Sequence, residues 1–236
     1  MEFYFTPDTN INYPARSLTI TGQEAKHLFK VLRKRDGDEI EVTDGKLSIY
    51  TCRISLISSD SITCEILKKR TSIGESETEV TVYFSILKNL DRYEFGIEKL
   101  VEVGVKNIIP IITERVIVKE PLSENKISRF NKIVRSAVSQ SQRCFLPVIN
   151  NIQYLKDLRS ENDSENIFMY EFAPSNNKLK TISHKKVNII IGPEGGFTEH
   201  EADFLSMKGW NPYSLGERKY RAETAAIIAA SQAVNL

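Results

Sequence analysis

The chain has 236 residues, of which 41% are hydrophobic and 27% are charged, with a formal net charge of +1. This length suffices for one large domain or two modest ones, and the near-neutral charge excludes a polybasic, histone-like binder. Cys52, Cys64 and Cys144 lack metal-ligand spacing and leave one thiol unpaired, which favours a reducing compartment. No apolar run approaches the roughly 18 residues of a membrane span, and the first residues lack the pattern of a secretory signal. We therefore expect a cytoplasmic protein with no membrane association and no metal site.

Short stretches of alternating apolar and polar residues fill much of the first third of the chain. This alternation is typical of half-buried β-strands, and it predicts strands over 40–42, 50–56 and 62–66. Asp44-Gly45 is a hairpin signal between the first two of these strands. Several short strands with tight turns favour a small barrel or sandwich.

One helix is predicted within this strand-rich part. Thr21 and Glu24 have the three-residue spacing of a capping box, in which each side chain bonds to the backbone of the other residue. Apolar residues then recur at helical spacing and predict a single buried face made of Ala25, Leu28, Phe29 and Leu32.

Residues 71–79 are polar and lack apolar periodicity beyond Ile73, which indicates a domain boundary. We therefore predict one domain over 1–72 and a second over 73–236. The first is the strand-rich domain, and the second has a different pattern.

Buried strands alternate with amphipathic helices in the second domain. A strand over 80–87, a helix over 92–103 and a strand over 105–113 form a βαβ unit, which implies two parallel strands. Gly104 is a C-terminal cap for this helix. We also expect a helix that begins at Ser123, strands over 167–170 and 187–191, and a final helix over 222–234. The second domain is thus predicted to be an α/β domain with a parallel sheet.

The stretch 187–201 carries the most informative pattern, because a buried strand runs into a glycine-rich turn and then a helix. The turn reads Gly192-Pro193-Glu194-Gly195-Gly196, and Thr198 and Glu201 begin the helix with a second capping-box pattern. Glycines without Cβ atoms let a ligand approach backbone N–H and C=O groups. The turn lacks the signatures of a phosphate loop and of a dinucleotide site, which disfavours a general nucleotide-binding module. The pattern predicts either a small ligand that is not led by phosphate or a tight turn without a ligand.

A second glycine turn, Leu215-Gly216, precedes the final helix. Glu223 lies in the first turn of that helix, where a carboxylate complements the helix dipole, and this explanation suffices for it. Arg221 lies just before the helix, where a cation is mildly unfavourable, so it indicates an anionic partner or a bound substrate. The helix itself is rich in small residues, which allow close packing against either a partner subunit or the chain's own core.

Together these segments resemble one family, the RsmE-type ribosomal RNA methyltransferases of the SPOUT superfamily. The matches run from residue 27 to residue 225, and the most specific are the two glycine turns with the residues that follow them. The matching segments are His27-Leu28, Val31-Leu32-Arg33, Glu98-Lys99, Glu102-Val103-Gly104-Val105, Pro110, Glu114-Arg115, Ile191 to Gly196, Leu215-Gly216-Glu217-Arg218, Arg221 and Glu223-Thr224-Ala225.

The resemblance implies a fold, a reaction and an assembly. The fold is a PUA-like β-barrel that binds RNA, followed by a SPOUT α/β domain with a parallel sheet and a trefoil knot. The reaction is methylation of N3 of a uridine in 16S ribosomal RNA of the small subunit, with S-adenosyl-L-methionine as the methyl donor and no metal. The assembly is a homodimer built across the α/β domain.

The family picture also implies roles for individual residues. Those expected to hold the methyl donor are Tyr170, Glu171, Gly192, Pro193, Glu194, Gly195, Gly196, Leu215, Gly216 and Thr224. Arg221 is expected to orient the base or to stabilise charge that develops on it, because an arginine stays protonated and cannot act as the base. The proton acceptor is unassigned, with Glu194 as a candidate.

Local cations are expected to bind the RNA, although an ordinary solvated surface is the alternative for each. The cations chosen are Arg33, Arg35, Lys88, Arg92, Arg135 and Arg143. Two positions depart from the family pattern, because Ser139 replaces a glutamate and Ala222 replaces a threonine, so the roles of those side chains are not carried over. Two alternatives therefore stay open: a methyltransferase with a different RNA target, and a SPOUT-like RNA-binding or assembly protein without catalysis.

Overall fold

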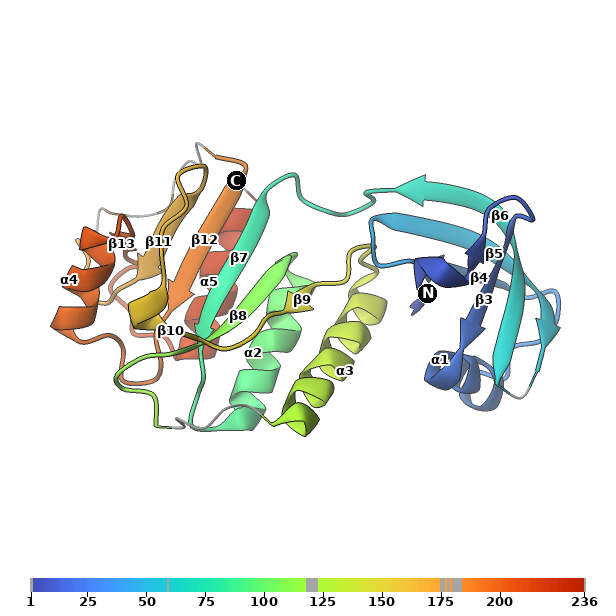
Figure 1. The fold of residues 1–236 in the computed structure, drawn as a ribbon, viewed down its shortest axis with the longest axis horizontal. Helices are drawn as coiled ribbons and strands as arrows, with labels where there is room; N and C mark the ends of the chain where they lie inside the picture. Colours follow the sequence, from blue (N-terminus) through green and yellow to red (C-terminus); the bar gives the residue numbers. More distant parts are fainter. Residues whose placement is uncertain are drawn as a thin grey trace. The chain divides into compact units, whose positions relative to one another are not determined.

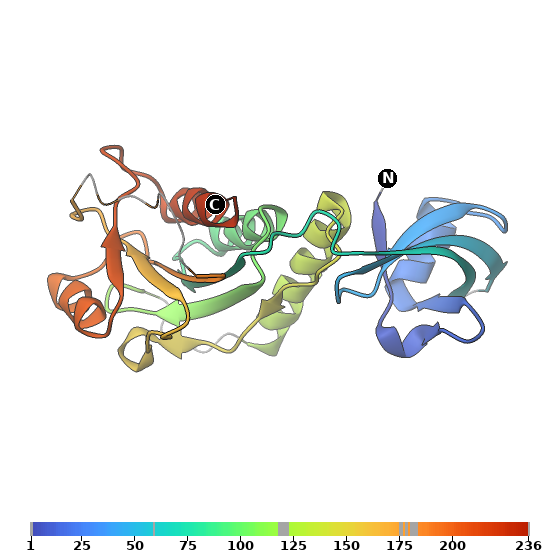
Figure 2. The same cartoon turned by 90° about the horizontal axis from the view of Figure 1, so that it is seen from above.

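The computed structural model describes residues 2–58, 60–117, 123–174, 177, 179 and 184–235. The chain forms two compact units, one comprising Met1–Glu75 and Arg135–Leu146 and the other Ser76–Val134 and Pro147–Leu236. The predicted domain limits, 1–72 and 73–236, stay a prediction, and they do not anticipate residues 135–146 in the first unit. The elements of both units are shown in Figures 1 and 2.

The first unit is built on a six-stranded sheet with the order β1-β4-β5-β6-β3-β2. All of its neighbouring strands are antiparallel except β1 and β4, which are parallel. The strands are β1 (Phe3–Phe5), β2 (Ile11–Asn12), β3 (Ser17–Thr21), β4 (Glu39–Thr43), β5 (Ser48–Ile57) and β6 (Ser61–Thr71). The predicted hairpin at Asp44-Gly45 is confirmed, because β4 and β5 pair across it. The predicted alternation is confirmed as well, since Ile40, Val42, Ile62 and Cys64 lie in the buried core.

The predicted helix after Thr21 differs from expectation in two ways. Thr21 is the N-cap of α1 (Gly22–Lys26), but its side chain makes no capping bond, so the predicted capping box is wrong. The chain then continues as the π-helical turn η2 (His27–Val31), where the backbone N–H of Leu32 bonds to the carbonyl of His27. This wider turn rotates the following side chains away from the face expected of an α-helix. Phe29 and Leu32 are consequently exposed, whereas Ala25 and Leu28 are buried as predicted.

The second unit contains a parallel sheet with the order β10-β8-β7-β12-β11-β13, and β9 also pairs with β8. Every recorded strand pair in it is parallel, which confirms the predicted α/β class. The strands are β7 (Glu79–Ser85), β8 (Asn107–Ile112), β9 (Val148–Ile149), β10 (Gln153–Tyr154), β11 (Glu165–Met169), β12 (Lys186–Ile191) and β13 (Asn211–Tyr213). The short 3-10 turns η1 (Asp8–Asn10) and η3 (Leu155–Asp157) complete the small elements of the two units. The trefoil knot stays a prediction.

Helices cover both faces of the parallel sheet. α2 (Leu90–Glu102) and α5 (Ala222–Val234) pack on one face, and α4 (Glu199–Met207) contributes buried residues to the core on the other (Figures 1 and 2). Gly104, with a φ of 109°, ends α2 as predicted. α3 (Glu124–Ser141) belongs to the second unit up to Val134 and to the first from Arg135. In the described parts of the chain, every helix is too short or too polar to cross a lipid bilayer.

Candidate functional site

Three loops of the second unit surround one cavity of about 690 Å³. They follow β11, β12 and β13, which are neighbours in the sheet, so the loops leave its carboxyl edge side by side (Figure 1). Ligand sites of open α/β sheets lie at this edge. The two glycine turns identified in the sequence therefore share one hollow, and the main chain reaches its wall through Gly192, Gly196 and Gly216.

The loop after β12 is closely packed, and its glycines make that packing possible. A Cβ on Gly195 would meet Cδ of Arg115 at 3.2 Å, and Gly196 adopts a φ of 66°, which favours glycine. Arg115 also donates through Nη1 to the carbonyl oxygen of Gly195. The second predicted capping box is confirmed: Thr198 Oγ1 accepts from the N–H of Glu201 at 3.1 Å, and Glu201 Oε2 accepts from the N–H of Thr198 at 2.9 Å.

The loops after β11 and β13 provide the rest of the wall. The backbone N–H of Tyr170 donates to the carbonyl of Tyr213 at 2.9 Å, which ties the two strand ends together. Glu171 and Lys219 form an exposed ion pair at 3.1 Å from one loop to the other. Gly216, with a φ of 105°, makes the turn after Leu215.

Of the ten residues predicted to hold the methyl donor, all but Thr224 line this cavity. Thr224 lies in the first turn of α5, and its neighbours Ala222 and Ala225 line the cavity instead. Arg221 also lines the cavity and is the N-cap residue of α5. The sequence did not identify several other lining residues, among them Met169, Phe172, Ala173, Tyr213 and Tyr220. Met169 and Tyr213 end β11 and β13, and Phe172 and Ala173 follow β11 closely, so the strand ends were the available signal for these four.

Arg92 was predicted to contact RNA, and the structure places it in the wall of the same cavity. Its Nε and Nη2 donate to the two carboxylate oxygens of Glu223 at 2.9 and 2.5 Å. Its Nη1 lies 3.7 Å from Oε1 of Glu194. Arg92 therefore joins the first turn of α5 to the glycine loop after β12. Since 131 residues separate Arg92 from Glu223, no local pattern indicated this pair.

Glu223 is the buried member of this pair, with 8% of its side chain exposed. Desolvation raises the pKa of this carboxyl, but the hydrogen bonds from Arg92 and from its own backbone outweigh that effect and lower the pKa below its ordinary value. Glu223 is thus ionised at neutral pH and fixes the guanidinium. Glu223 therefore does more than complement the helix dipole, the role that sequence analysis gave it, because it also holds Arg92 in place.

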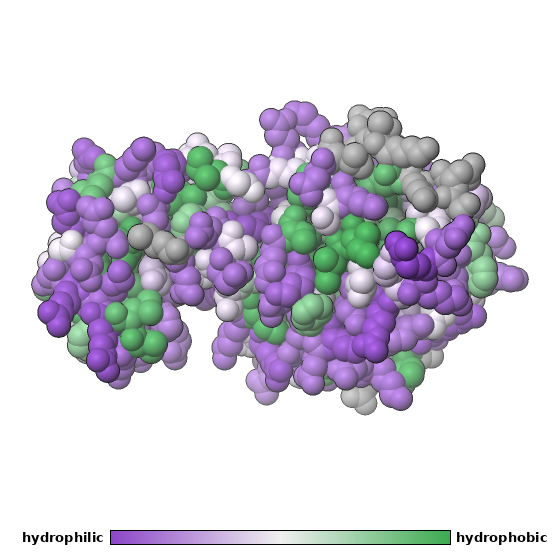
Figure 3. Space-filling view, turned by 180° about the vertical axis from the view of Figure 1, so that it is seen from behind, coloured by the Kyte–Doolittle hydropathy of each residue, from purple (hydrophilic) through white to green (hydrophobic). Residues whose placement is uncertain are grey.

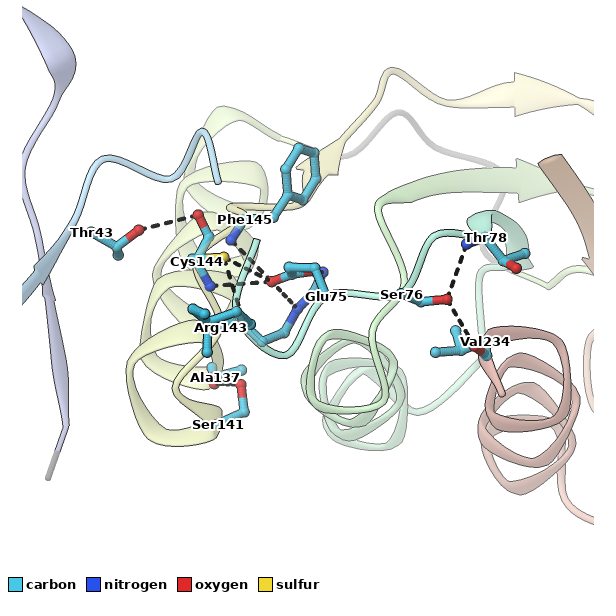
Figure 4. Close-up of polar contacts among 11 residues, drawn as sticks. Thr43, Glu75, Ser76, Thr78, Ala137, Ser141, Arg143, Cys144, Phe145 and Val234 are labelled. Atoms are coloured by element: carbon cyan, nitrogen blue, oxygen red, sulfur yellow. Dashed lines mark hydrogen bonds and ion pairs between the residues drawn. The ribbon is translucent and has the colours of Figure 1, made fainter. Parts of the chain in front are cut away.

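The remaining predicted cations have different surroundings. Arg33, Arg35 and Lys88 are exposed, and the exposed Arg135 lies 5.2 Å from the ring centre of Phe5. Arg143 is only 4% exposed and donates from Nε and Nη2 to Glu75 at 3.2 and 2.7 Å (Figure 4). Burial against a carboxylate argues against the predicted RNA contact of Arg143, because its charge is already compensated inside the protein.

The described residues contain no cluster of three or more histidine, cysteine or acidic side chains able to hold a metal ion. All three cysteines are buried free thiols. The cavity is lined by main-chain groups, aromatic rings, carboxylates and arginines.

Comparison with known protein families gives the class. The model of an RNA methyltransferase domain matches residues 74–234, and that of an RNA methyltransferase PUA domain matches residues 20–67. The class is thus an RNA methyltransferase whose catalytic domain follows a PUA domain. The chain belongs to the family of ribosomal RNA small subunit methyltransferase E, the RsmE-type family that its sequence resembles.

Individual relatives support this assignment along the chain. Ribosomal RNA small subunit methyltransferase E of Aquifex aeolicus is 31% identical over 90% of this chain and 91% of its own length. The protein of the same name from Buchnera aphidicola is 31% identical over 97% of this chain and 86% of its own length. The crystal structure of the Neisseria gonorrhoeae enzyme, bound to S-adenosyl methionine, superposes with a TM-score of 0.87 at 30% identity and covers 98% of this chain and 95% of that one.

Proposed function

We propose that this protein transfers a methyl group from S-adenosyl-L-methionine to N3 of a uridine in 16S ribosomal RNA of the small subunit. The observation that supports this most is the cavity at the carboxyl edge of the sheet, which both glycine turns line. Family membership and the donor-bound structure of the Neisseria gonorrhoeae relative agree with it.

The residues of the cavity fit such a donor. A volume of about 690 Å³ lies within the roughly 300–1,000 Å³ usual for small-molecule sites. Gly192, Gly196 and Gly216 have no Cβ atoms, so a ligand can approach the main chain there, and aromatic rings at Tyr170 and Phe172 offer apolar surface. When bound, S-adenosylmethionine supplies an electrophilic methyl group on a sulfonium. The protein's task is to hold the acceptor base in line with that methyl group, which alone can lower the barrier by several kcal/mol.

Arg221 is the residue we assign to orienting the base. It lines the cavity with an exposed side chain at the start of α5, where a guanidinium can donate to uracil oxygens as they gain charge. Arg221→Ala should lower turnover by about 10²–10³-fold, the range for losing one such donor, with unchanged donor affinity by calorimetry. Lys208→Ala, a surface change at the end of α4, is the control. Near-normal turnover of Arg221→Ala would contradict the assignment.

The first unit is proposed to hold the RNA. Arg33 and Arg35 are exposed there, within a few residues of Phe29 and Val31, whose side chains are also exposed. Cations next to exposed apolar and aromatic side chains suit single-stranded RNA, which offers phosphates and unstacked bases. Replacing Arg33 by Gln should reduce the salt slope of RNA binding by about 0.7, the share of one phosphate contact. An unchanged slope would remove Arg33 from the binding surface.

We also propose a homodimer in the cytoplasm. Apolar residues gather over α5 on one face of the second unit (Figure 3), and Ile227 and Ile228 are only half-buried there. Such a strip is typical of a protein interface. Ile228→Arg should shift the protein from dimer to monomer in sedimentation analysis, and a wild-type monomer would contradict the proposal.

The modified nucleoside decides between this function and the alternatives. Mass spectrometry of nucleosides from small-subunit RNA of a deletion strain should show the loss of 3-methyluridine, and its return with the cloned gene. Loss of another methylated nucleoside would indicate a different target. No loss at all, together with retained RNA binding, would indicate the non-catalytic alternative.

A further inference from the structure

A second hollow of about 880 Å³ adjoins the cavity of the proposed donor site. It is formed by the segment after β7, the first turn of α2, the segment after β8 and the glycine loop. Arg92, Glu194 and Gly195 belong to the linings of both hollows. The two hollows therefore adjoin at these three residues, and a molecule in the second hollow lies next to one in the first.

The lining of this second hollow carries three cations together with the carboxylates of Asp91 and Glu194. Lys88 and Arg115 are exposed cations at its surface, and the guanidinium of Arg92 lies deeper, with 28% of its side chain exposed. Cations at such a surface suit the phosphates that flank a nucleotide. Ile117 adds an exposed apolar surface against which a base can lie.

Glu194 is the one carboxylate shared by the two linings, and its known contacts hold one of its two carboxylate oxygens. Its Oε1 accepts from the backbone N–H of Lys88 at 3.2 Å and lies 3.7 Å from Nη1 of Arg92. Both contacts found among the described residues fall on Oε1, so Oε2 is available to a ligand. A carboxylate beside a guanidinium fits the edge of uracil, where the N3–H donor lies between two carbonyl acceptors.

We propose that this second hollow, which we call the acceptor cleft (Lys88, Arg92, Arg115, Ile117, Glu194 and Gly195), binds the target uridine and that Glu194 accepts its N3 proton. The inference rests on the proposed methyl transfer and names the residues that receive its acceptor. Glu194 borders both hollows, so its carboxylate can lie beside the edge of the base from which the proton leaves as the methyl arrives.

The step balances in atoms and electrons. The N3–H bond breaks and its proton goes to Oε2 of Glu194, while the N3 electron pair forms the bond to the methyl carbon. The electron pair of the broken carbon–sulfur bond stays on sulfur, which converts the sulfonium to a neutral thioether. Glu194 then returns the proton to water. Arg92 donates to one uracil oxygen that gains charge, and the other oxygen is left to Arg221, which lines the adjoining donor cavity. Glu223 holds the guanidinium of Arg92 in place through two hydrogen bonds.

Replacing the carboxylate tests the chemistry directly. Glu194→Gln keeps the shape but cannot accept a proton, so turnover on unmodified small-subunit RNA should fall by about 10²–10⁴-fold. Affinities for S-adenosylmethionine and for RNA should stay within a few-fold of wild type, which also shows that the variant is folded. Glu194→Asp should retain intermediate activity.

The pH profile separates a proton acceptor from a structural residue. The Gln variant should regain turnover as the pH rises toward the ionisation of uracil itself, because the base then arrives without its N3 proton. Wild type should show no comparable gain. A Gln variant with near-wild-type turnover, or with a profile parallel to that of wild type, would overturn the role of Glu194.

A second variant tests the cleft without touching the chemistry. Lys88→Gln should weaken binding of the same RNA and lower its salt slope by about 0.7, with unchanged affinity for S-adenosylmethionine. Lys156→Gln removes a cation from η3 and serves as the control. Equal salt slopes for both variants and wild type would place the nucleotide elsewhere. If wild type neither binds S-adenosylmethionine nor methylates RNA, the proposed function fails; if wild type is active and both variants match it, only the acceptor cleft fails.

Discussion

The Glu75–Arg143 pair of the first unit and the Glu223–Arg92 pair of the second have the same chemistry but different surroundings. Glu75 accepts from Nε and Nη2 of Arg143 and from the backbone N–H groups of Cys144 and Phe145, both at 3.1 Å (Figure 4). The side chains of Arg143 and Glu75 are 5% and 2% exposed. Arg92, by contrast, is 28% exposed and opens onto both hollows.

The difference shows how one kind of ion pair serves two purposes. Glu75 uses its hydrogen bonds to fix the chain just after α3 in the first unit, so its loss should affect folding. Glu223 leaves Nη1 of Arg92 facing Glu194, so its loss should affect the reaction more than the fold. Three measurements test this distinction, beginning with the largest expected effect, and a fourth compares the helix starts of the two units.

Breaking the buried Glu75–Arg143 pair should be the most damaging change. Glu75→Ala leaves the guanidinium of Arg143 buried without its carboxylate partner, and breaking a buried pair in this way costs about 3–5 kcal/mol of unfolding free energy. Urea unfolding followed by circular dichroism measures it. Glu39→Ala breaks an exposed pair with Arg53 in the same unit and should cost less than about 1 kcal/mol. Equal costs for the two variants would contradict a structural role of Glu75.

Disturbing the Glu223–Arg92 pair should affect turnover more than it affects stability. Glu223→Gln keeps the side-chain shape but weakens its hold on Arg92, and a displaced guanidinium should lower turnover by about a hundredfold. Steady-state kinetics measure this, with donor affinity measured alongside. Glu98→Gln, which removes an exposed partner of Lys99 on the same helix as Arg92, should leave turnover unchanged. A Glu223 variant that loses stability but no turnover would make the two pairs alike.

Acid should weaken the Glu223–Arg92 pair, because it protonates the carboxylate of Glu223. Its pKa in the folded protein is lowered, so the ionised carboxyl contributes stability above its ordinary value of 4.5 and loses it as the pH falls through the folded value. The difference in unfolding free energy between wild type and Glu223→Gln should therefore be constant near neutral pH and shrink below pH 4.5. Urea titrations at a series of pH values follow it, and a difference that grows toward acid would contradict the sign.

The smallest expected effect is the difference in stability cost between replacing the N-cap residue of α4 and replacing that of α1. Thr198 forms both bonds of its capping box, so Thr198→Ala should cost about 1 kcal/mol. Thr21 has the same spacing to a glutamate but makes no side-chain capping bond, so Thr21→Ala should cost clearly less. Thermal unfolding of the two variants measures the difference. Equal losses would mean that the capping geometry does not decide the cost.

These two helix starts also show where reasoning from sequence succeeds. The spacing of Thr198 and Glu201 predicted a box that forms, and the same spacing at Thr21 predicted one that does not. A spacing limits only which side chains can meet. The π-helical turn at His27–Val31 then decided that Phe29 faces solvent, and nothing in the apolar periodicity announced that turn.

The sequence by itself determined the alternation of strands and helices, the class of each domain, and the two glycine turns with Arg221. These features depend on local periodicity, on missing Cβ atoms and on charges near helix ends, all of which are encoded within a few residues. Only the tertiary structure decided that Arg92 pairs with Glu223, that Arg143 is buried against Glu75, and that Glu194 lies between two hollows. Such contacts join segments far apart along the chain, and their partners are set by the order of strands in the sheet rather than by any neighbouring residue.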